Sequence, residues 1–378
     1  MRATILKYHI TVFLLICLTV SGKAQYRILE DQGAVKQVHQ AIDSIYNLNF
    51  DAADVIIADL ENKLGEYPGV FLLKAFYISW KYRPLKKDHI SYQLFESYLL
   101  RGIEKSEEML NKDENDVEAS FYLMACHAYL AELYVNNGSN FKALGEAKSA
   151  YKYIKVGFDH TTDNPEFFFS SGIYNFYRER YPEENPFYKS FLWFFRSGDM
   201  EEGINQLMQG AENAVFTQAE CLTYLYHIYL RYEDNPSDAI FYAIKLKDKY
   251  PDNLHYISNF VENKIRLNQY DGLLPYIEKL VTGKKEYYQY LGEIFYGNYL
   301  EMHDSLSTDA LSHYKLADQL GDQDEIRMPH YDSMLFLGLG RIYLLHGNTD
   351  LGIQYLKRSV KVAEYSAYRK DAEALLSK

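Results

Sequence analysis

Histidines and acidic residues are the first candidates for chemistry in this chain, and their spacing decides what they can do. No two histidines stand three or four residues apart, the spacing that places two metal ligands on one face of a helix. Acidic pairs such as Glu107-Glu108 are adjacent, so on a helix their carboxylates point in different directions. We therefore predict no metal site, no cofactor and no acid/base pair within one helix.

Motifs of nucleophilic catalysis and nucleotide binding are also missing from the sequence. It contains no G-x-S-x-G, no H-E-x-x-H and no G-x-x-x-x-G-K-[ST]. Gly338-x-Gly340 falls inside an expected helix with no strand before it, which favours close helix packing. The sequence predicts a protein that is not an enzyme. An active site would require residues of different helices, such as Glu220, His227 and Glu262, to meet in one deep pocket.

Composition indicates a folded chain with an acidic surface. Of its 378 residues, 48% are hydrophobic, and the formal net charge is −12. A pI near 5.4 argues against a nucleic-acid partner, because phosphate binding requires clustered Lys and Arg. The 37 tyrosines supply many side chains that pack through the ring and hydrogen-bond through the hydroxyl.

The first 24 residues have the pattern of a secretory signal peptide. Arg2 and Lys7 precede a short apolar run over residues 10–20, and Gly22-Lys23-Ala24 offers small residues two apart. The run is too short to span a bilayer, which takes roughly 20 residues. We expect cleavage after Ala24 and export to the periplasm or beyond. The residue before Cys17 is Ile rather than a small residue, so we do not expect a lipoprotein.

The chain after Ala24 contains no segment apolar enough to span a membrane. Its two cysteines, Cys126 and Cys221, lie far apart in apolar helical stretches. This position favours two buried free thiols. A disulfide between the two cysteines is the alternative, because exported chains can form such bonds.

Apolar residues recur at three- and four-residue spacing almost everywhere after residue 33, which is typical of amphipathic helices. Short breaks interrupt this pattern, for example at Pro68-Gly69, Asn137-Gly138 and Gly347-Asn348. Strand signals are nearly absent. The pattern predicts a succession of helical hairpins, with long second helices near residues 92–110 and 141–158.

Two spacings of large and small residues recur among these hairpins, one in first helices and one in second helices. The clearest examples are Phe336-x2-Leu339-Gly340-x2-Tyr343, Tyr288-x2-Leu291-Gly292-x2-Phe295, Ala239-x3-Ala243-x2-Leu246 and Leu273-x3-Ile277-x2-Leu280, the last two being 34 residues apart. These spacings resemble the tetratricopeptide repeat (TPR) family, whose period is 34 residues, although no unit has Trp at the first large position. The resemblance implies an all-α, right-handed α-α superhelix, a TPR-like solenoid that binds proteins or peptides.

The repeat pattern is clearer in the C-terminal half of the chain than in the N-terminal half. We expect a signal peptide over residues 1–24, divergent helical hairpins over 25–186, and TPR-like repeats over 187–378 that end in a capping helix. The two helical parts are expected to form one continuous solenoid, because such repeats bury their apolar faces only against their neighbours.

The concave face of a solenoid is its usual binding surface, and the first helix of each hairpin forms most of it. Positions flanking the packing residues are Glu220, His227, His255, Glu262, Glu286, Gln289, Glu293 and Arg341. This set predicts an acidic groove that binds a basic or amine-bearing protein or peptide segment. The same glutamates also suit ordinary solvated helix faces. The main hypothesis is a non-enzymatic scaffold of the cell envelope, with its oligomeric state open.

A second candidate region is the dense aromatic stretch between Phe167 and Phe195. Two interpretations apply: a packed core between hairpins, or an exposed platform that stacks on sugars or other small ligands. A polar loop expected over residues 180–186 divides the stretch. The site residues of this alternative are Arg180, Tyr181, Phe187, Tyr188 and Trp193. They would make the chain an exported small-ligand or glycan-binding protein.

Overall fold

The computed structural model describes residues 26–82, 85, 87, 89–184, 189, 195–303, 308–323 and 326–377. Most of these residues are helical, and none of those described lies in a strand. The α-helices are α2 (Gln32–Tyr46), α3 (Phe50–Leu64), α4 (Pro68–Lys81), α5 (Ile90–Leu110), α6 (Val117–Asn136), α7 (Asn140–Asp159), α8 (Phe167–Glu184), α9 (Met200–Asn213), α10 (Gln218–His227), α11 (Pro236–Lys249), α12 (Leu254–Arg266), α13 (Leu274–Val281), α14 (Glu286–His303), α15 (Thr308–Gln323), α16 (Pro329–Leu345), α17 (Thr349–Val362) and α18 (Ser366–Leu376). A short 3-10 helix, η1 (Ile28–Glu30), precedes α2, and a π-helix, η3 (Ile228–Tyr232), continues α10.

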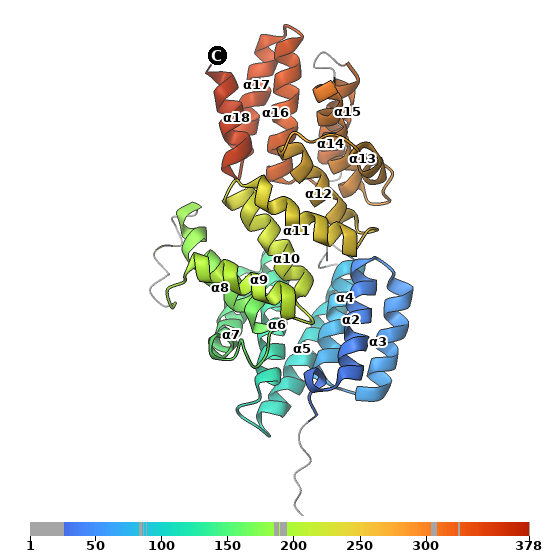
Figure 1. Cartoon of the computed structure of the whole chain (residues 1–378), viewed down its shortest axis with the longest axis vertical. Coiled ribbons are helices and arrows are strands. Elements are labelled where there is room, and N and C mark those ends of the chain that lie inside the picture. The colour runs from blue at the N-terminus through green and yellow to red at the C-terminus, as the bar shows by residue number, and fades with distance from the viewer. Residues whose placement is uncertain are drawn as a thin grey trace, which may run out of the picture.

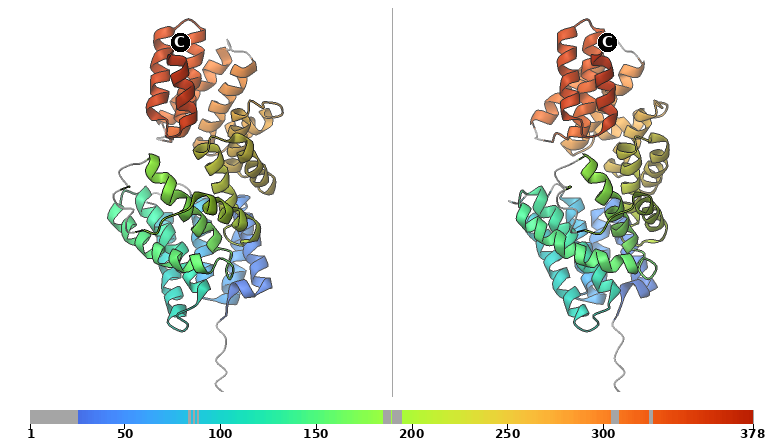
Figure 2. Two further views of the ribbon diagram at one scale, coloured as in Figure 1. Left: turned by 60° about the vertical axis from the view of Figure 1, so that its left-hand side comes forward. Right: turned by 90° about the vertical axis from the view of Figure 1, so that its left-hand side faces the viewer.

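Consecutive helices pack as antiparallel hairpins, and the hairpins stack through their first helices. Helix α2 contacts α4, α4 contacts α6, and the series resumes with α12, α14, α16 and α18. The N-terminal hairpins and the C-terminal α16–α18 lie at opposite ends of the molecule (Figures 1 and 2). The fold is therefore the all-α superhelix of helical hairpins that the sequence predicts, and the chain is a helical-repeat protein.

Short turns between helices depend on one residue with positive φ followed by a capping residue. Gly347 has φ of +79°, and the side chain of Asn348 then accepts a hydrogen bond from the backbone N–H of Leu351. Between α2 and α3, Leu48 takes φ of +58° and Asn49 caps the next helix. Such caps satisfy N–H groups that the first helical turn leaves without a partner.

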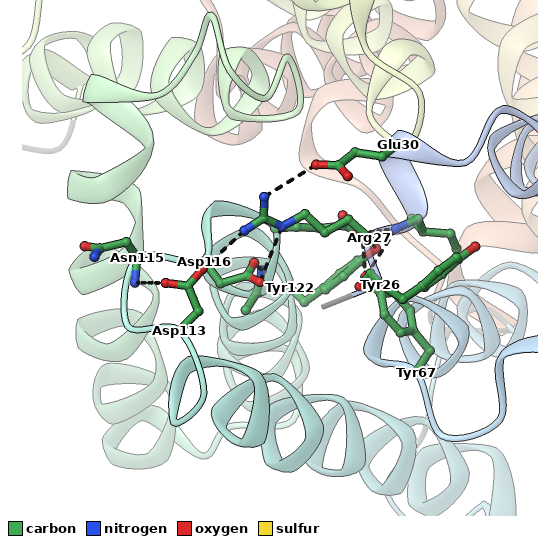
Figure 3. A network of polar contacts seen from close by, with 11 residues as sticks. Tyr26, Arg27, Glu30, Tyr67, Asp113, Asn115, Asp116 and Tyr122 are labelled. Atoms are coloured by element: carbon green, nitrogen blue, oxygen red, sulfur yellow. Dashed lines mark hydrogen bonds and ion pairs between the residues drawn. The ribbon is translucent and has the colours of Figure 1, made fainter. Parts of the chain in front are cut away.

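The first described residues make polar contacts with the start of α6, as Figure 3 shows. Arg27 donates to the carboxylate of Asp113 at 3.3 Å and faces that of Asp116 at 3.6 Å. Behind it, buried Glu118 accepts the backbone N–H of Ile28 at 3.1 Å. Burial raises the pKa of Glu118. The expected cleavage site after Ala24 lies outside the described residues.

Both expected free thiols are found. Cys126 and Cys221 are buried and unbonded in the described structure, and burial raises the pKa of each thiol. The two long second helices are also confirmed as α5 and α7. No helix among the described residues combines the length and apolar character that crossing a membrane requires.

A close helix contact joins α8 to α9 and depends on two glycines. A Cβ added at Gly203 would lie 2.8 Å from the carbonyl oxygen of Gly172 and 2.7 Å from the backbone nitrogen of Phe176. Backbone atoms cannot yield as a flexible side chain can. Replacing Gly203 with Ala should therefore lower the free energy of unfolding by about 1–3 kcal/mol, measured by urea denaturation.

A matched control for this substitution lies one hairpin away. Gly145 is exposed within α7, and a Cβ added there would meet no atom within 4 Å. Gly145→Ala should raise stability by about 0.5–1 kcal/mol, because Ala restricts the unfolded chain and favours the helix. Equal effects of the two substitutions would contradict the close α8–α9 contact.

Candidate functional site

A cavity of about 970 Å³ lies between helices that are far apart in the sequence. Most of its lining comes from α2, α4, α6, α8, α10 and α12, which are the first helices of successive hairpins. The concave face of the array is thus the wall of this cavity. Its volume falls at the upper end of the range typical of ligand sites in proteins.

The cavity is bounded because the first hairpin, α2–α3, contacts the start of the sixth, α12–α13. The side-chain amide of Asn253 donates to the backbone carbonyl of Tyr46 at 2.7 Å, and the Tyr250 hydroxyl donates to Asp43 at 2.9 Å. The ring of Tyr46 lies 4.9 Å from that of Tyr250 and 5.8 Å from that of Tyr256, measured between centroids. These contacts between α2 and the α11–α12 turn close one turn of the superhelix.

Two groups of aromatic rings contribute to the lining. The first group comes from α2, α4 and α12, where Trp80 lies 4.9 Å from Tyr46 and 6.2 Å from Tyr256. The second comes from α8, α10 and η3, where Tyr177 lies 6.1 Å from Tyr224 and 5.3 Å from Tyr232. All of these rings line the cavity. Such a lining suits a ligand with large apolar or aromatic groups.

Polar side chains reach the cavity along one face of α10 and η3. We call this set the α10 ridge: Thr217, Glu220, Tyr224, His227 and Arg231. Their spacing alternates between three and four residues, which keeps them on one side of a helix. The ridge ends in the π-helix η3, a local geometry that is frequent at functional sites.

The two ends of the α10 ridge differ in charge. The carboxyl group of Glu220 accepts a hydrogen bond from the Tyr46 hydroxyl. Eleven residues further on, Arg231 directs Nη2 toward Glu262 at 3.6 Å and toward the Tyr331 hydroxyl at 3.4 Å. Burial lowers the pKa of the Arg231 guanidinium, but Glu262 and the neighbouring tyrosine hydroxyls together outweigh burial and raise this pKa.

His227 lies between these ends, in surroundings that favour its neutral form. Burial, followed by the positive charge of Arg231 and the nearby His255, lowers the pKa of His227 well below its usual range. Its buried Nδ1 makes no hydrogen bond within the described part of the chain, and neither does Nε of Arg231. The ridge therefore presents two buried polar atoms that a ligand can engage.

Three of the concave-face residues expected from the sequence meet in this cavity: Glu220, His227 and His255. The lining is not purely acidic, because Arg178 and Arg231 accompany Glu132 and Glu220.

Three other expected residues lie in polar contacts between helices and do not line the cavity. Glu262 is fully buried, and its Oε1 lies 2.5 Å from Nε2 of His330. Glu293 is buried with Oε2 2.5 Å from Nδ1 of His313. Arg341 makes a bidentate pair with Glu301 at 2.6 and 2.8 Å. Glu262 therefore does not join Glu220 and His227 in lining this cavity.

Glu286 and Gln289 lie on α14, away from the cavity. Glu286 is exposed at the first position of the helix, and Gln289 donates to the carbonyl of Gly283 at 2.7 Å. Neither lines the cavity.

The aromatic stretch of the alternative site contains both core residues and residues that line the cavity. Phe167 and Phe176 are fully buried core residues, whereas Tyr174 and Tyr177 line the cavity. The expected loop over residues 180–186 is wrong for residues 180–184, because α8 continues to Glu184. Arg180 holds this last turn by pairing with Glu183 at 2.6 Å and donating to the carbonyl of Tyr232 at 3.0 Å. Phe187, Tyr188 and Trp193 lie outside the described residues, as does the side chain of Tyr181.

Sequence reasoning missed Trp80, Tyr224 and Arg231. Tyr224 and Arg231 continue the spacing that identifies Glu220 and His227, so extending the same helical face would have found them. Trp80 ends a helix that lacks the repeat pattern, and only the closed turn brings it near α12.

Comparison with known proteins adds little to this geometry. No protein-family model matches the chain, and no curated protein matches it. Among solved structures, the human IFIT1 dimer with m7Gppp-AAAA matches with 13% identity and a TM-score of 0.34, over 87% of this chain and 94% of that one. A similarity at this level gives no argument about what this chain binds.

Proposed function

We propose that this chain is an exported, non-enzymatic binding protein whose concave cavity takes a peptide segment rich in apolar and aromatic side chains. The observation that carries the proposal is the bounded cavity of about 970 Å³, walled by aromatic rings from six hairpins. The charged start and apolar run of residues 1–24 support export. The resemblance to TPR spacing supports a peptide ligand.

The binding mode follows from the lining. The two groups of lining rings can hold large side chains of a ligand, because aromatic pairs gain about 0.5–1.5 kcal/mol beyond simple burial. The few polar groups of the α10 ridge would fix its orientation, as convergent polar groups do in mostly apolar sites.

A cavity-filling substitution tests this proposal. Ala128 is exposed on α6 and lines the cavity, so Ala128→Trp should occupy part of the volume without disturbing the core. We expect the uncharged fluorescent probe N-phenyl-1-naphthylamine to bind the wild type. Its Kd should rise at least tenfold in Ala128→Trp, measured by fluorescence titration.

The control is Ala374→Trp, an exposed position on α18 that does not line the cavity. It should bind the probe as the wild type does. Absence of binding to the wild type, or equal binding by both variants, would show that the cavity is not the site.

A second candidate function is favoured by one residue. Trp80 is partly exposed in the cavity beside several tyrosines, an arrangement on which sugar rings stack. A small glycan is therefore the alternative ligand. Soluble oligosaccharides should then change the tryptophan fluorescence of the wild type and leave that of Trp80→Phe unchanged.

A further inference from the structure

From the α10 ridge we infer that the ligand is a short peptide of four or five residues with both termini free, its ammonium group near Glu220 and its carboxylate near His227 and Arg231. This inference rests on the proposed function and names the ligand class of the same site.

The first argument is the order of charges along the ridge. Glu220 supplies an acid at one end, and Arg231 supplies a guanidinium at the other. Among the charged residues of the lining, Arg178 and Arg231 balance Glu132 and Glu220. A ligand with one positive and one negative end preserves this balance, whereas a singly charged ligand adds a net charge to an apolar setting.

The second argument comes from the carboxylate end. Nε of Arg231 and Nδ1 of His227 are buried without a hydrogen-bond partner in the described chain. The described contacts of the Arg231 guanidinium with Glu262 and with the Tyr331 hydroxyl are made by Nη2, so Nε stays available to another acceptor. A terminal carboxylate has two oxygens and can accept from both side chains, provided that the neutral imidazole carries its proton on Nδ1.

The third argument comes from the ammonium end. Glu220 and Tyr46 are joined by a hydrogen bond, and the Trp80 ring lies beside them, 4.9 Å from the Tyr46 ring. A carboxyl group in a cavity that also contains tyrosine and indole rings is a suitable setting for a protonated amine, through ion pairing and the cation–π interaction.

The fourth argument is length. Glu220 and Arg231 are eleven residues apart, which is about 16 Å along a helix at 1.5 Å per residue. An extended peptide spans about 3.3–3.6 Å per residue, so four or five residues match this separation. The apolar walls on both sides of the ridge then receive the side chains.

The experiment uses four pools of tetrapeptides with random apolar and aromatic side chains. One pool has free termini, one is N-acetylated, one is C-amidated, and one is blocked at both ends. Each pool is incubated with the mature chain, and retained peptides are quantified by mass spectrometry. We expect retention from the free-ended pool to exceed retention from each of the others at least tenfold.

Two variants assign the ends. Glu220→Gln removes the charge but can still accept from the Tyr46 hydroxyl, and it should lose only the preference for a free amine. Arg231→Lys keeps a positive charge beside Glu262 but removes Nε, and it should lose only the preference for a free carboxylate. Thermal melting of each variant confirms that it is folded.

The outcomes separate the two proposals. Equal retention of blocked and free peptides overturns the free-ended ligand and leaves the proposed cavity function standing. Retention of no peptide by a protein that still binds N-phenyl-1-naphthylamine also overturns it. Failure to bind that probe at all overturns the proposed function itself.

Discussion

Replacing Glu262 with Ala is expected to lower the free energy of unfolding by about 3–5 kcal/mol, the cost of breaking a buried ion pair by removing one partner. Glu262 is fully buried and joins three parts of the chain. His330 of α16 lies 2.5 Å from Oε1, and the hydroxyls of Tyr226 and Tyr331 donate to Oε2 at 3.2 and 3.1 Å. Its loss would leave Arg231 as a buried cation without its counter-charge.

Urea denaturation at pH 7 measures this effect, with Glu262→Gln as the matched control. Glutamine keeps the volume and can accept hydrogen bonds, so the control should cost less than the alanine variant. Wild-type stability in Glu262→Ala would contradict the contacts described.

The same network should make the stability of the fold fall as the pH is lowered. Burial alone would raise the pKa of Glu262, but His330 and Arg231 outweigh it, so its pKa in the folded chain lies below the usual range. A carboxyl group with a lowered pKa contributes its full stability above the unfolded pKa of about 4.3 and loses it as the pH falls further. The stability difference between wild type and Glu262→Gln should therefore narrow below about pH 4.

Replacing Tyr46 with Ala should both destabilise the fold and abolish binding in the cavity. The Tyr46 ring is 1% exposed and contacts Phe76, Trp80, Tyr250 and Tyr256. Truncating a buried aromatic ring costs about 3–5 kcal/mol. Because Tyr46 is the main contact between α2 and α12, the closed turn should loosen, and affinity for N-phenyl-1-naphthylamine should fall at least tenfold.

Two controls separate the loss of the ring from general destabilisation. Tyr290→Ala removes an equally buried ring on α14, whose hydroxyl likewise donates to a carboxylate, that of Asp332 at 2.9 Å. It should lose similar stability and keep its affinity for the probe. Tyr46→Phe removes only the hydroxyl bonded to Glu220 and should cost about 1 kcal/mol. Full binding by Tyr46→Ala would mean that the closed turn does not form the site.

Local spacing was enough to predict the helices and part of the site. The positions of Glu220 and His227 on an inward face follow from the packing residues between them, because both patterns share the period of one helix. His255 is found in the same way on α12. The position of each of these residues can be predicted from the sequence of its own hairpin alone.

Other features depend on helices that are distant in the sequence. Glu262 is predicted to face the groove, but it lies buried between helices, where His330 of α16 contacts it. Trp80 reaches the cavity because the superhelix curves enough to bring α4 near α12. The π-helix η3 carries no signal in the repeat spacing, yet it helps position Arg231. Curvature is the sum of many small helix rotations, and no single repeat encodes it.

The contact between Tyr46 and Tyr256 changes how this array must assemble. In an open solenoid each repeat touches only its neighbours, so the protein can grow or fray one repeat at a time. Here, residues 207 positions apart, Tyr46 and Asn253, share a hydrogen bond. The first hairpin can complete its contacts only after the sixth has been synthesised and folded. A fragment that ends before α12 would lose the whole site rather than one sixth of it.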